Sequence, residues 1–226
     1  MVLYLSDFSK ELLKLIKERR SVRIFTGEKI PRKEILSIIE AGIWAPTGCN
    51  NQELRFLIID DEEIINEFVS RFKPFFKGVS TIVLIFCDMS LPNSRIYVER
   101  ETARHLPYID AGLALANMIL YAKSKGIDSC IFNISEYHFI EQPRKLSFVE
   151  KIKRRIFIML GLQKLLKDNF EYYLRKRLKI PKHLKILCGV AFGYAKVYPD
   201  VKKAMHGGRK IMREKVDYYV IKWCHK

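Results

Sequence analysis

The feature that most constrains the fold is a continuous apolar run at residues 80–87, Ser-Thr-Ile-Val-Leu-Ile-Phe-Cys. The run is rich in β-branched residues and shows no alternation of polar and apolar positions. A bounded run of this kind is typical of a buried strand. The sequence therefore predicts a strand at 80–87 in the interior of a layered domain.

Helices and strands are expected to alternate along the rest of the chain. Helical periodicity and capping residues predict helices at 7–18, 31–44, about 60–71 and about 107–125. Ser6 or Asp7 would cap the first helix. The second would begin at Pro31, with an apolar face of Ile35, Ile38, Ile39 and Ile43. Further strands are expected at 55–60, 127–133 and 185–195, so the predicted fold class is α+β.

Length and composition fit one domain spanning residues 1–226. Of these residues 49% are hydrophobic, which is enough for a substantial core. The longest apolar run, 156–162, is too short to cross a bilayer, and residues 1–10 do not read as a secretory signal. We therefore expect a soluble, cytoplasmic protein, with a peripheral place at a membrane left open.

The cysteines and histidines predict neither a disulfide framework nor a metal site. Five cysteines are scattered without a Cys-x-x-Cys pair, and five histidines show no ligand spacing. Cys87, Cys130 and Cys188 lie in strand-like stretches and are expected in the core. Cys49 lies in a polar loop, where we expect packing rather than contact with a substrate.

A basic segment follows the first predicted helix. It reads Arg19-Arg20-Ser21-Val22-Arg23-Ile24-Phe25. In an extended chain Arg19, Ser21 and Arg23 share one side, because side chains alternate across a strand. Guanidinium groups bind phosphate with charge-assisted bonds, so the segment suits an elongated anionic ligand. The alternative is a solvated, arginine-rich strand.

A polar loop follows the second predicted helix. It reads Ala45-Pro46-Thr47-Gly48-Cys49-Asn50-Asn51-Gln52. Pro46 ends the helical pattern, and Gly48 permits close approach of the backbone to a ligand. The amides of Asn and Gln offer donors and acceptors that can read the edge of a heterocycle. Taken alone, the segment is better explained as an ordinary polar turn into the next strand.

In this order and spacing the two segments resemble the nitroreductase family of FMN-dependent oxidoreductases. Later motifs agree with the family pattern: an Asp-x-Gly-x-Ala helix from Asp110, a Gly-x-x-Ser-Cys turn at 126–130, an Ile-Pro pair at 180–181 and a Gly-Tyr pair at 193–194. A basic pair, Arg209-Lys210, stands where the family has one. The resemblance covers about residues 8–133 and 180–217, and it rests on the ordered set of motifs.

The chain departs from the family pattern in three places. Glu53-Leu54 replaces the usual Pro-Trp, and Ile211 stands where proline is common. Residues at about 135–180 form a basic, helical insertion with no family counterpart. The first two departures leave flavin binding intact but make the substrate pocket hard to assign.

The resemblance implies a mixed sheet flanked by helices, and an intertwined homodimer with FMN at its subunit interface. By this resemblance the phosphate end of FMN is held by Arg19, Arg20, Ser21 and Arg209. Arg23 would face the pyrimidine edge of the ring and stabilise negative charge on the reduced cofactor. The partner subunit would contribute Pro46, Thr47, Gly48 and Asn50, and the backbone of Phe132 and Asn133 would lie near flavin N5.

The implied activity is that of an NAD(P)H oxidoreductase acting on a small electron-poor acceptor such as a nitroaromatic or a quinone. The chain carries no dinucleotide-binding fingerprint, so NADH or NADPH would bind over the flavin itself. No catalytic side chain is assigned, because the chemistry belongs to the flavin. Flavin-dependent dehalogenation or desaturation on the same scaffold is the alternative reaction.

Charge is concentrated in one part of the chain. Residues 144–185 contain 14 Lys and Arg against 3 Asp and Glu, a net +11 of the chain's +16. We expect a helical cap whose apolar side packs on the domain. The alternatives are weak binding to an anionic membrane surface and, less favoured, to nucleic acid. A non-catalytic basic binding protein is the rival function, although it would not need the flavin-like motif set.

Overall fold

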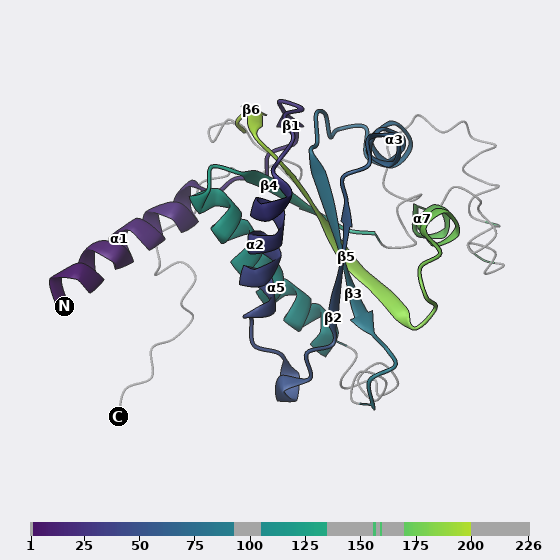
Figure 1. Ribbon diagram of the computed structural model, residues 1–226, viewed down its shortest axis with the longest axis horizontal. Coiled ribbons are helices and arrows are strands. Elements are labelled where there is room, and N and C mark those ends of the chain that lie inside the picture. The colour runs from purple at the N-terminus through teal and green to yellow at the C-terminus, as the bar shows by residue number, and fades with distance from the viewer. Residues whose placement is uncertain (1, 93–104, 135–155, 157–158, 160–169, 200–226) are drawn as a thin grey trace.

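A four-stranded antiparallel sheet forms the centre of the molecule (Figure 1). The computed structural model describes residues 2–92, 105–134, 156, 159 and 170–199. The strand order is β2 (Leu54–Ile59), β3 (Thr81–Asp88), β5 (Leu184–Gly193) and β4 (Asp128–Phe132). A second, two-stranded sheet pairs β1 (Ile24–Phe25) with β6 (Ala195–Val197). Parallel pairing among the described residues is confined to the isolated bridges Ser21–Ser129 and Ile24–Lys77.

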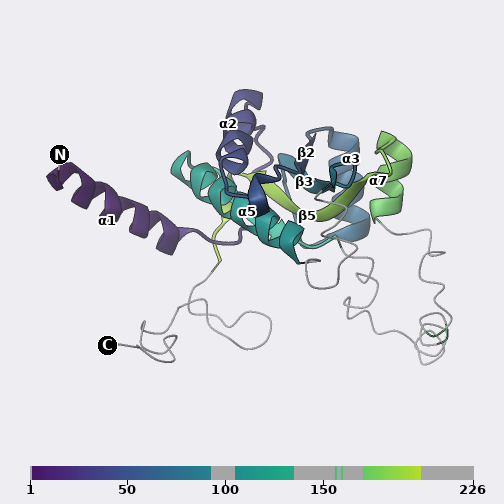
Figure 2. The ribbon, with the colours of Figure 1, turned by 90° about the horizontal axis from the view of Figure 1, so that it is seen from below.

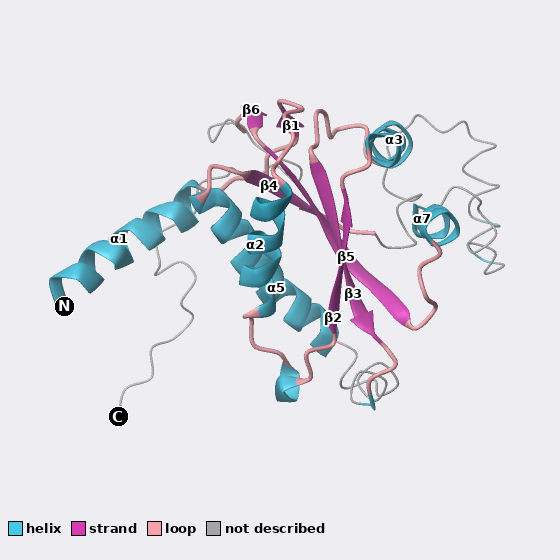
Figure 3. Ribbon diagram, viewed as in Figure 1, coloured by secondary structure: helices cyan, strands magenta, loops and turns pink. Residues whose placement is uncertain are grey.

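Helices cover both faces of the sheet (Figure 3). On one face lie α2 (Arg32–Ile43) and α5 (Leu106–Ser124), and on the other lie α3 (Glu62–Glu67) and α7 (Phe170–Leu178). A short 3-10 turn, η1 (Gly48–Asn50), precedes β2, and a π-helical turn, η2 (Phe68–Phe72), continues α3. The expected α+β fold class is confirmed, but the expectation of a mixed sheet is wrong for the described strands, because β2, β3, β5 and β4 all pair antiparallel.

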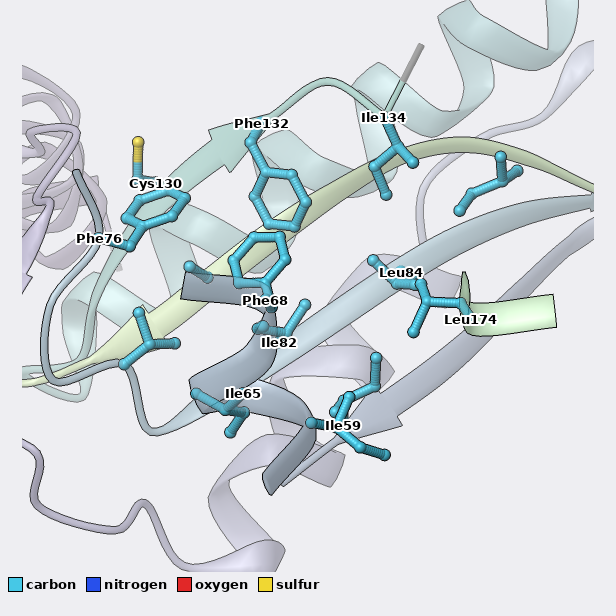
Figure 4. Close-up of a cluster of buried hydrophobic side chains, with 14 of the residues drawn as sticks. Ile59, Ile65, Phe68, Phe76, Ile82, Leu84, Cys130, Phe132, Ile134 and Leu174 are labelled. Carbon is cyan, nitrogen blue, oxygen red and sulfur yellow. The ribbon is translucent and has the colours of Figure 1, made fainter. Parts of the chain in front are cut away.

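The predicted interior strand is confirmed as β3. All eight of its residues are buried, and its side chains enter a separate apolar cluster on each face of the sheet. Figure 4 shows one cluster, where the rings of Phe68, Phe76 and Phe132 gather beside Cys130. The other cluster packs β3 against α2 and α5.

A glycine sets the approach of α2 to α5. A Cβ atom on Gly42 would lie 2.7 Å from Cγ of Met118, and Met118 is fully buried. Ala114 lies at the same crossing with its carbonyl close to Gly42. The close approach of the two helices therefore involves Gly42 on α2 and the small residue Ala114 on α5.

The first helix differs from its prediction. Helix α1 runs Val2–Glu18, so neither Ser6 nor Asp7 caps it. Figure 2 shows α1 extending away from the layered body. Its apolar residues Phe8, Leu12, Leu13 and Ile16 are exposed in the single chain. The end of α2 also differs, because Ile43, expected on its buried face, is 62% exposed.

Residues 170–180, at the end of the basic insertion, pack on the domain, whereas the two other described residues of the insertion, Ile156 and Met159, are exposed. Leu174 of α7 is fully buried in the cluster that also contains Phe68. Arg177 forms an ion pair with Glu63 of α3. This part agrees with the expected helical cap, whereas residues 135–155, 157–158 and 160–169 lie outside the described residues.

The cysteine predictions are partly wrong. Cys87 and Cys130 are buried as expected, and Cys188 is half-buried. Cys49 is exposed, because the turn that carries it bends outward with a left-handed backbone, so the expectation that it packs is wrong. Cys224 lies outside the described residues. No helix in the described part of the chain is both long and apolar enough to span a membrane.

Candidate functional site

The basic segment after α1 runs between two other parts of the chain. Val22 N–H donates to the carbonyl of Ser129 on β4 over 3.0 Å. On its other side Lys77 N–H donates to the carbonyl of Arg23 over 3.0 Å, and Phe25 N–H donates to Lys77 over 2.8 Å. The segment is thereby held extended, as the sequence predicts.

The extended backbone separates apolar from polar side chains. Val22 is fully buried in the core, whereas Arg19, Ser21 and Arg23 are half-buried. The chain bends at Gly78, which packs against the backbone of Phe25 in this segment and has φ of +65°. A Cβ atom there would lie 2.4 Å from the carbonyl oxygen of Phe25, so the turn requires glycine.

Arg19, Ser21 and Arg23 converge on the thiol of Cys130. Burial raises the pKa of Cys130. The positive charges of Arg23 and Arg19 and a hydrogen bond from Ser21 act on that pKa in the opposite direction. The three side chains that the alternation placed together are thus close enough to act on one buried group.

Lys73 is a fourth polar member of this group, and the sequence analysis missed it. Its side chain is only 6% exposed, and its charge also acts on Cys130. The ammonium lies 5.9 Å from the ring centroids of both Phe75 and Phe132. In the sequence Lys73 stands between Phe72 and Phe75, which was the signal for a cation among aromatic rings. In the structure it lies at the end of the π-helical turn η2. Such turns are frequent at functional sites.

We call Arg19, Ser21, Arg23, Lys73 and Cys130 the cationic end of the sheet. Arg20 is not part of it, because its guanidinium turns back to the carbonyls of Lys17 and Arg19 at the end of α1. Three cations and a hydroxyl around a partly buried floor can hold a phosphate or an anionic ring. Within the described residues, no three His, Cys, Asp or Glu side chains gather as a metal site would require.

The polar loop before β2 is held in an uncommon backbone shape. Cys49, Asn50 and Gln52 have φ of 52°, 53° and 52°. Non-glycine residues in this region cost about 1–3 kcal/mol each and persist where surrounding contacts hold them. Here Thr47 accepts from Gln52 N–H through its hydroxyl and from Asn50 N–H through its carbonyl, both over 3.0 Å.

Two buried carboxyl groups anchor this loop. Gly48 N–H donates to Asp110 Oδ2 on α5 over 3.0 Å, and Asn51 Nδ2 donates to Glu53 Oε2 over 2.9 Å. Glu53 is fully buried and Asp110 is 3% exposed. Burial raises the pKa of Glu53, and hydrogen bonding with the Asp110 carboxyl raises it further. We call residues 47–53 with Asp110 the acid end of the sheet.

The two ends are far apart within one chain. Ser21 bridges to Ser129, which lies level with Thr81 at the start of β3, whereas Glu53 bonds to Asp88 at its end. An eight-residue strand spans roughly 25 Å. In Figure 1 β1 lies at the top and the turn that joins α2 to β2 lies at the bottom.

The remaining candidate residues fall in different places. The Phe132 side chain is buried, with its ring 5.0 Å from that of Phe68, so only its backbone can face a ligand. Asn133 follows it and is exposed. Pro46 is exposed beside the acid end, and Arg209 lies outside the described residues.

Comparison with known proteins matches this arrangement to one family. The family model described as Nitroreductase family matches residues 16–80 and 70–194. An iodotyrosine deiodinase of Thermotoga neapolitana is 27% identical over 160 residues, covering 59% of this chain and 79% of that protein. A protein of Archaeoglobus fulgidus named "Putative NADH dehydrogenase/NAD(P)H nitroreductase" is 24% identical over 86% of this chain and 91% of its own length.

Solved structures show the same fold. The crystal structure of a protein from Desulfovibrio desulfuricans, described as a "putative nitroreductase in complex with FMN", superposes with a TM-score of 0.60. It is 22% identical, and the match covers 95% of this chain and 98% of that one.

Proposed function

The chain belongs to the nitroreductase family of FMN-dependent oxidoreductases, and from this we propose that it uses FMN with NADH or NADPH to reduce a small electron-poor acceptor, such as a nitroaromatic or a quinone. The observation that carries the proposal is the cationic end, where Arg19, Ser21 and Arg23 act on one buried position. When bound, FMN would supply the chemistry by accepting hydride from the nicotinamide and passing electrons to the acceptor.

The residues present fit an anionic flavin nucleotide. Arg19 and Ser21 supply a charged donor and a hydroxyl for the phosphate, and Arg209 would join them from the C-terminal segment. Arg23 and Lys73 supply positive charge that favours an electron-rich ring over a neutral one. Because Arg20 already bonds to the end of α1, its part in holding the phosphate has the least support.

We propose that the functional unit is a homodimer. The acid end lies too far from the cationic end to meet the same ring edge within one chain, so the 46–50 loop would come from the partner subunit. An exposed apolar surface supports this assembly. It includes Phe8, Leu12, Leu13, Ile16, Leu36, Ile43, Trp44, Tyr108, Ile109 and Leu113 on α1, α2 and α5.

The small residues of α5 fit such an interface. Gly112 and Ala116 are exposed on the same face of α5 as Ile109 and Leu113, and a Cβ on Gly112 would meet nothing within 4 Å. Small residues flanked by apolar ones allow two helices to pack closely. Trp44, at 80% exposed, is a large side chain left without cover in the single chain.

A second reaction is supported by one comparison. The match to an iodotyrosine deiodinase favours reductive dehalogenation as the alternative on the same scaffold. A binding protein without redox activity is disfavoured, because it would have no need for the buried cation Lys73 beside Arg19 and Arg23.

The test is to purify the protein, record its flavin absorption with and without added FMN, and follow NADH and NADPH oxidation. The acceptor panel contains quinones, nitroaromatics and halogenated phenols. Flavin binding with acceptor-dependent oxidation supports the proposal, and preferential turnover of halogenated phenols would support the alternative. A protein that binds no FMN at saturating concentration would contradict both.

A further inference from the structure

We propose that Glu53 is a positioning residue that keeps its proton in the folded protein and donates it to Asp110, so that one shared proton holds the 47–52 loop in its flavin-facing shape. The inference rests on the proposed function for what the loop contacts. The carboxyl pair itself stands on the described contacts alone. Glu53 occupies a position where the family pattern has proline, so the carboxyl pair departs from that pattern.

The contacts of Glu53 leave one oxygen in need of a proton. Its backbone carbonyl accepts from Asp88 N–H over 2.9 Å, and its Oε2 accepts from Asn51 Nδ2 over 2.9 Å. Its Oε1 is buried and receives no donor among the described residues. A buried carboxylate oxygen without a donor is strongly disfavoured, whereas a protonated one becomes a donor itself.

Asp110 is the acceptor that this proton requires. Its carboxyl group hydrogen-bonds with that of Glu53, and its Oδ2 accepts from Gly48 N–H over 3.0 Å. Two ionised carboxylates in contact and away from water repel each other, so such a pair retains one proton. With the proton on Glu53, both of its oxygens and Asp110 Oδ2 are satisfied at once.

No other described charge compensates the pair. Asp88 on β3 and Arg55 on β2 lie nearby, but they form an ion pair with each other at 3.1 Å. Of the charged groups around Glu53, only Asp110 acts on its carboxyl, and it acts by repulsion and hydrogen bonding. The backbone N–H of Glu53 itself and, more weakly, Asn51 from the loop favour the ionised form, but burial and the Asp110 carboxyl outweigh them and the pKa is raised.

The two carboxyl groups hold the 47–52 loop near both of its ends. Asp110 holds Gly48 at the start, and Glu53 holds Asn51 near the finish. Between these anchors Cys49 and Asn50 adopt their left-handed backbone. Loss of the proton would set two like charges against each other under the loop and release it.

The sign of the pH effect follows from the raised pKa of Glu53. An acid whose pKa is raised by folding adds stability that is fully present below its unfolded pKa. That stability is lost as the pH rises through the folded value. The loop and the flavin affinity that depends on it should therefore weaken on the alkaline side.

The variants that test this are Glu53→Gln and Asp110→Asn. Gln at 53 keeps the shape and a donor toward Asp110, and Asn at 110 gives an ionised Glu53 a donor. Either should remove the pH sensitivity. Glu40→Gln, on the exposed surface of α2, is the matched control.

Three measurements are made on each dimeric protein. Infrared spectra recorded across a pH series should show a protonated carboxyl band in wild type and Glu40→Gln that persists to higher pH than an ordinary glutamic acid and is missing from Glu53→Gln. FMN affinity, by flavin fluorescence from pH 6 to 9, should fall in wild type by up to about tenfold per pH unit above the pKa, and stay level in the two pair variants. The melting temperature of the FMN-free protein should follow the same pattern.

The outcomes separate the two proposals. If wild type binds no FMN but shows the protonated band and the melting pattern, the carboxyl pair holds and the proposed function fails. If FMN binds while the band is absent from wild type, or while wild type and Glu53→Gln have parallel pH profiles, the pair proposal is wrong and the proposed function stands. Should Glu53→Gln fail to fold, the same comparison is made between wild type and Asp110→Asn.

Discussion

The two ends of the central sheet carry opposite kinds of charged group: cations at one end and buried carboxyl groups at the other. At the cationic end the charges of Arg19, Arg23 and Lys73 act on the buried thiol of Cys130. At the acid end Glu53 and Asp110 are both buried, and among the described side-chain contacts they accept hydrogen bonds from Asn51 and Gly48. One end concentrates charge that a ligand can neutralise, and the other neutralises its own charge with a proton.

The difference separates binding from positioning. Half-buried cations at a strand edge are suited to bind an anion, because the ligand supplies the counter-charge. Carboxyls closed off under a loop have no room for a ligand, so their effect is on the shape of the loop above them. Removing a cation should therefore alter affinity without altering the fold, whereas changes at the acid end should alter both.

The largest expected effect concerns the assembly that would bring the two ends together. Leu113→Glu on α5 should convert the dimer to monomer and abolish FMN binding. A charge buried without a partner at the interface would cost about 3–5 kcal/mol. Light scattering gives the mass, and flavin fluorescence gives the affinity.

The control for that variant is Lys176→Glu on α7, which lies on the opposite side of the sheet and is exposed. It should remain dimeric. A Leu113→Glu monomer that still bound one FMN per chain would show that a single chain completes the site.

The next effect tests the cationic end alone. Arg19→Ala should weaken FMN binding by one to two orders of magnitude, because a hydrogen bond to a charged group is worth about 1.5–3 kcal/mol. Arg32→Ala, an exposed cation on α2, should bind FMN as wild type does. Titration followed by flavin fluorescence measures both. Equal affinities would make Arg19 a solvated surface residue.

The smallest expected effect concerns Asp88, next to the acid end of the sheet, and its contribution to the stability of the fold at low pH. A hydrogen bond from the Ser90 hydroxyl is the main reason that the pKa of Asp88 lies below 3.8, with the Ser90 N–H and the charge of Arg55 adding to it. A carboxylate of lowered pKa adds stability above its unfolded pKa, and that stability is lost as the pH falls through the lowered value. Asp88→Asn should therefore cost about 1 kcal/mol at neutral pH and lose less stability on acidification.

Chemical denaturation at pH 7 and pH 3 gives the comparison. Asp60→Asn, an exposed carboxylate just after β2, should change neither value. If Asp88→Asn and wild type lost equal stability on acidification, the Ser90 and Arg55 contacts would contribute nothing to acid stability.

Much of the fold could be predicted from local sequence pattern. The interior strand β3, the helix α5 and the extended segment through Val22 follow from periodicity, because each side chain's face depends only on its neighbours in sequence. The left-handed turn at Cys49 was not readable, because asparagine-rich loops adopt several shapes. Only the contacts to Asp110, some sixty residues away, select this one.

The alternation of side chains along an extended segment was enough to predict that Arg19, Ser21 and Arg23 share a face. The family resemblance followed from the order and spacing of the motifs. Long-range contacts were needed to bring Lys73 to that group of three, and they also place Glu53 against Asp110. The protonation and binding properties of these side chains depend on their surroundings in the folded chain. A lysine among phenylalanines or a glutamate before a strand has no unusual chemistry until distant segments exclude water from it.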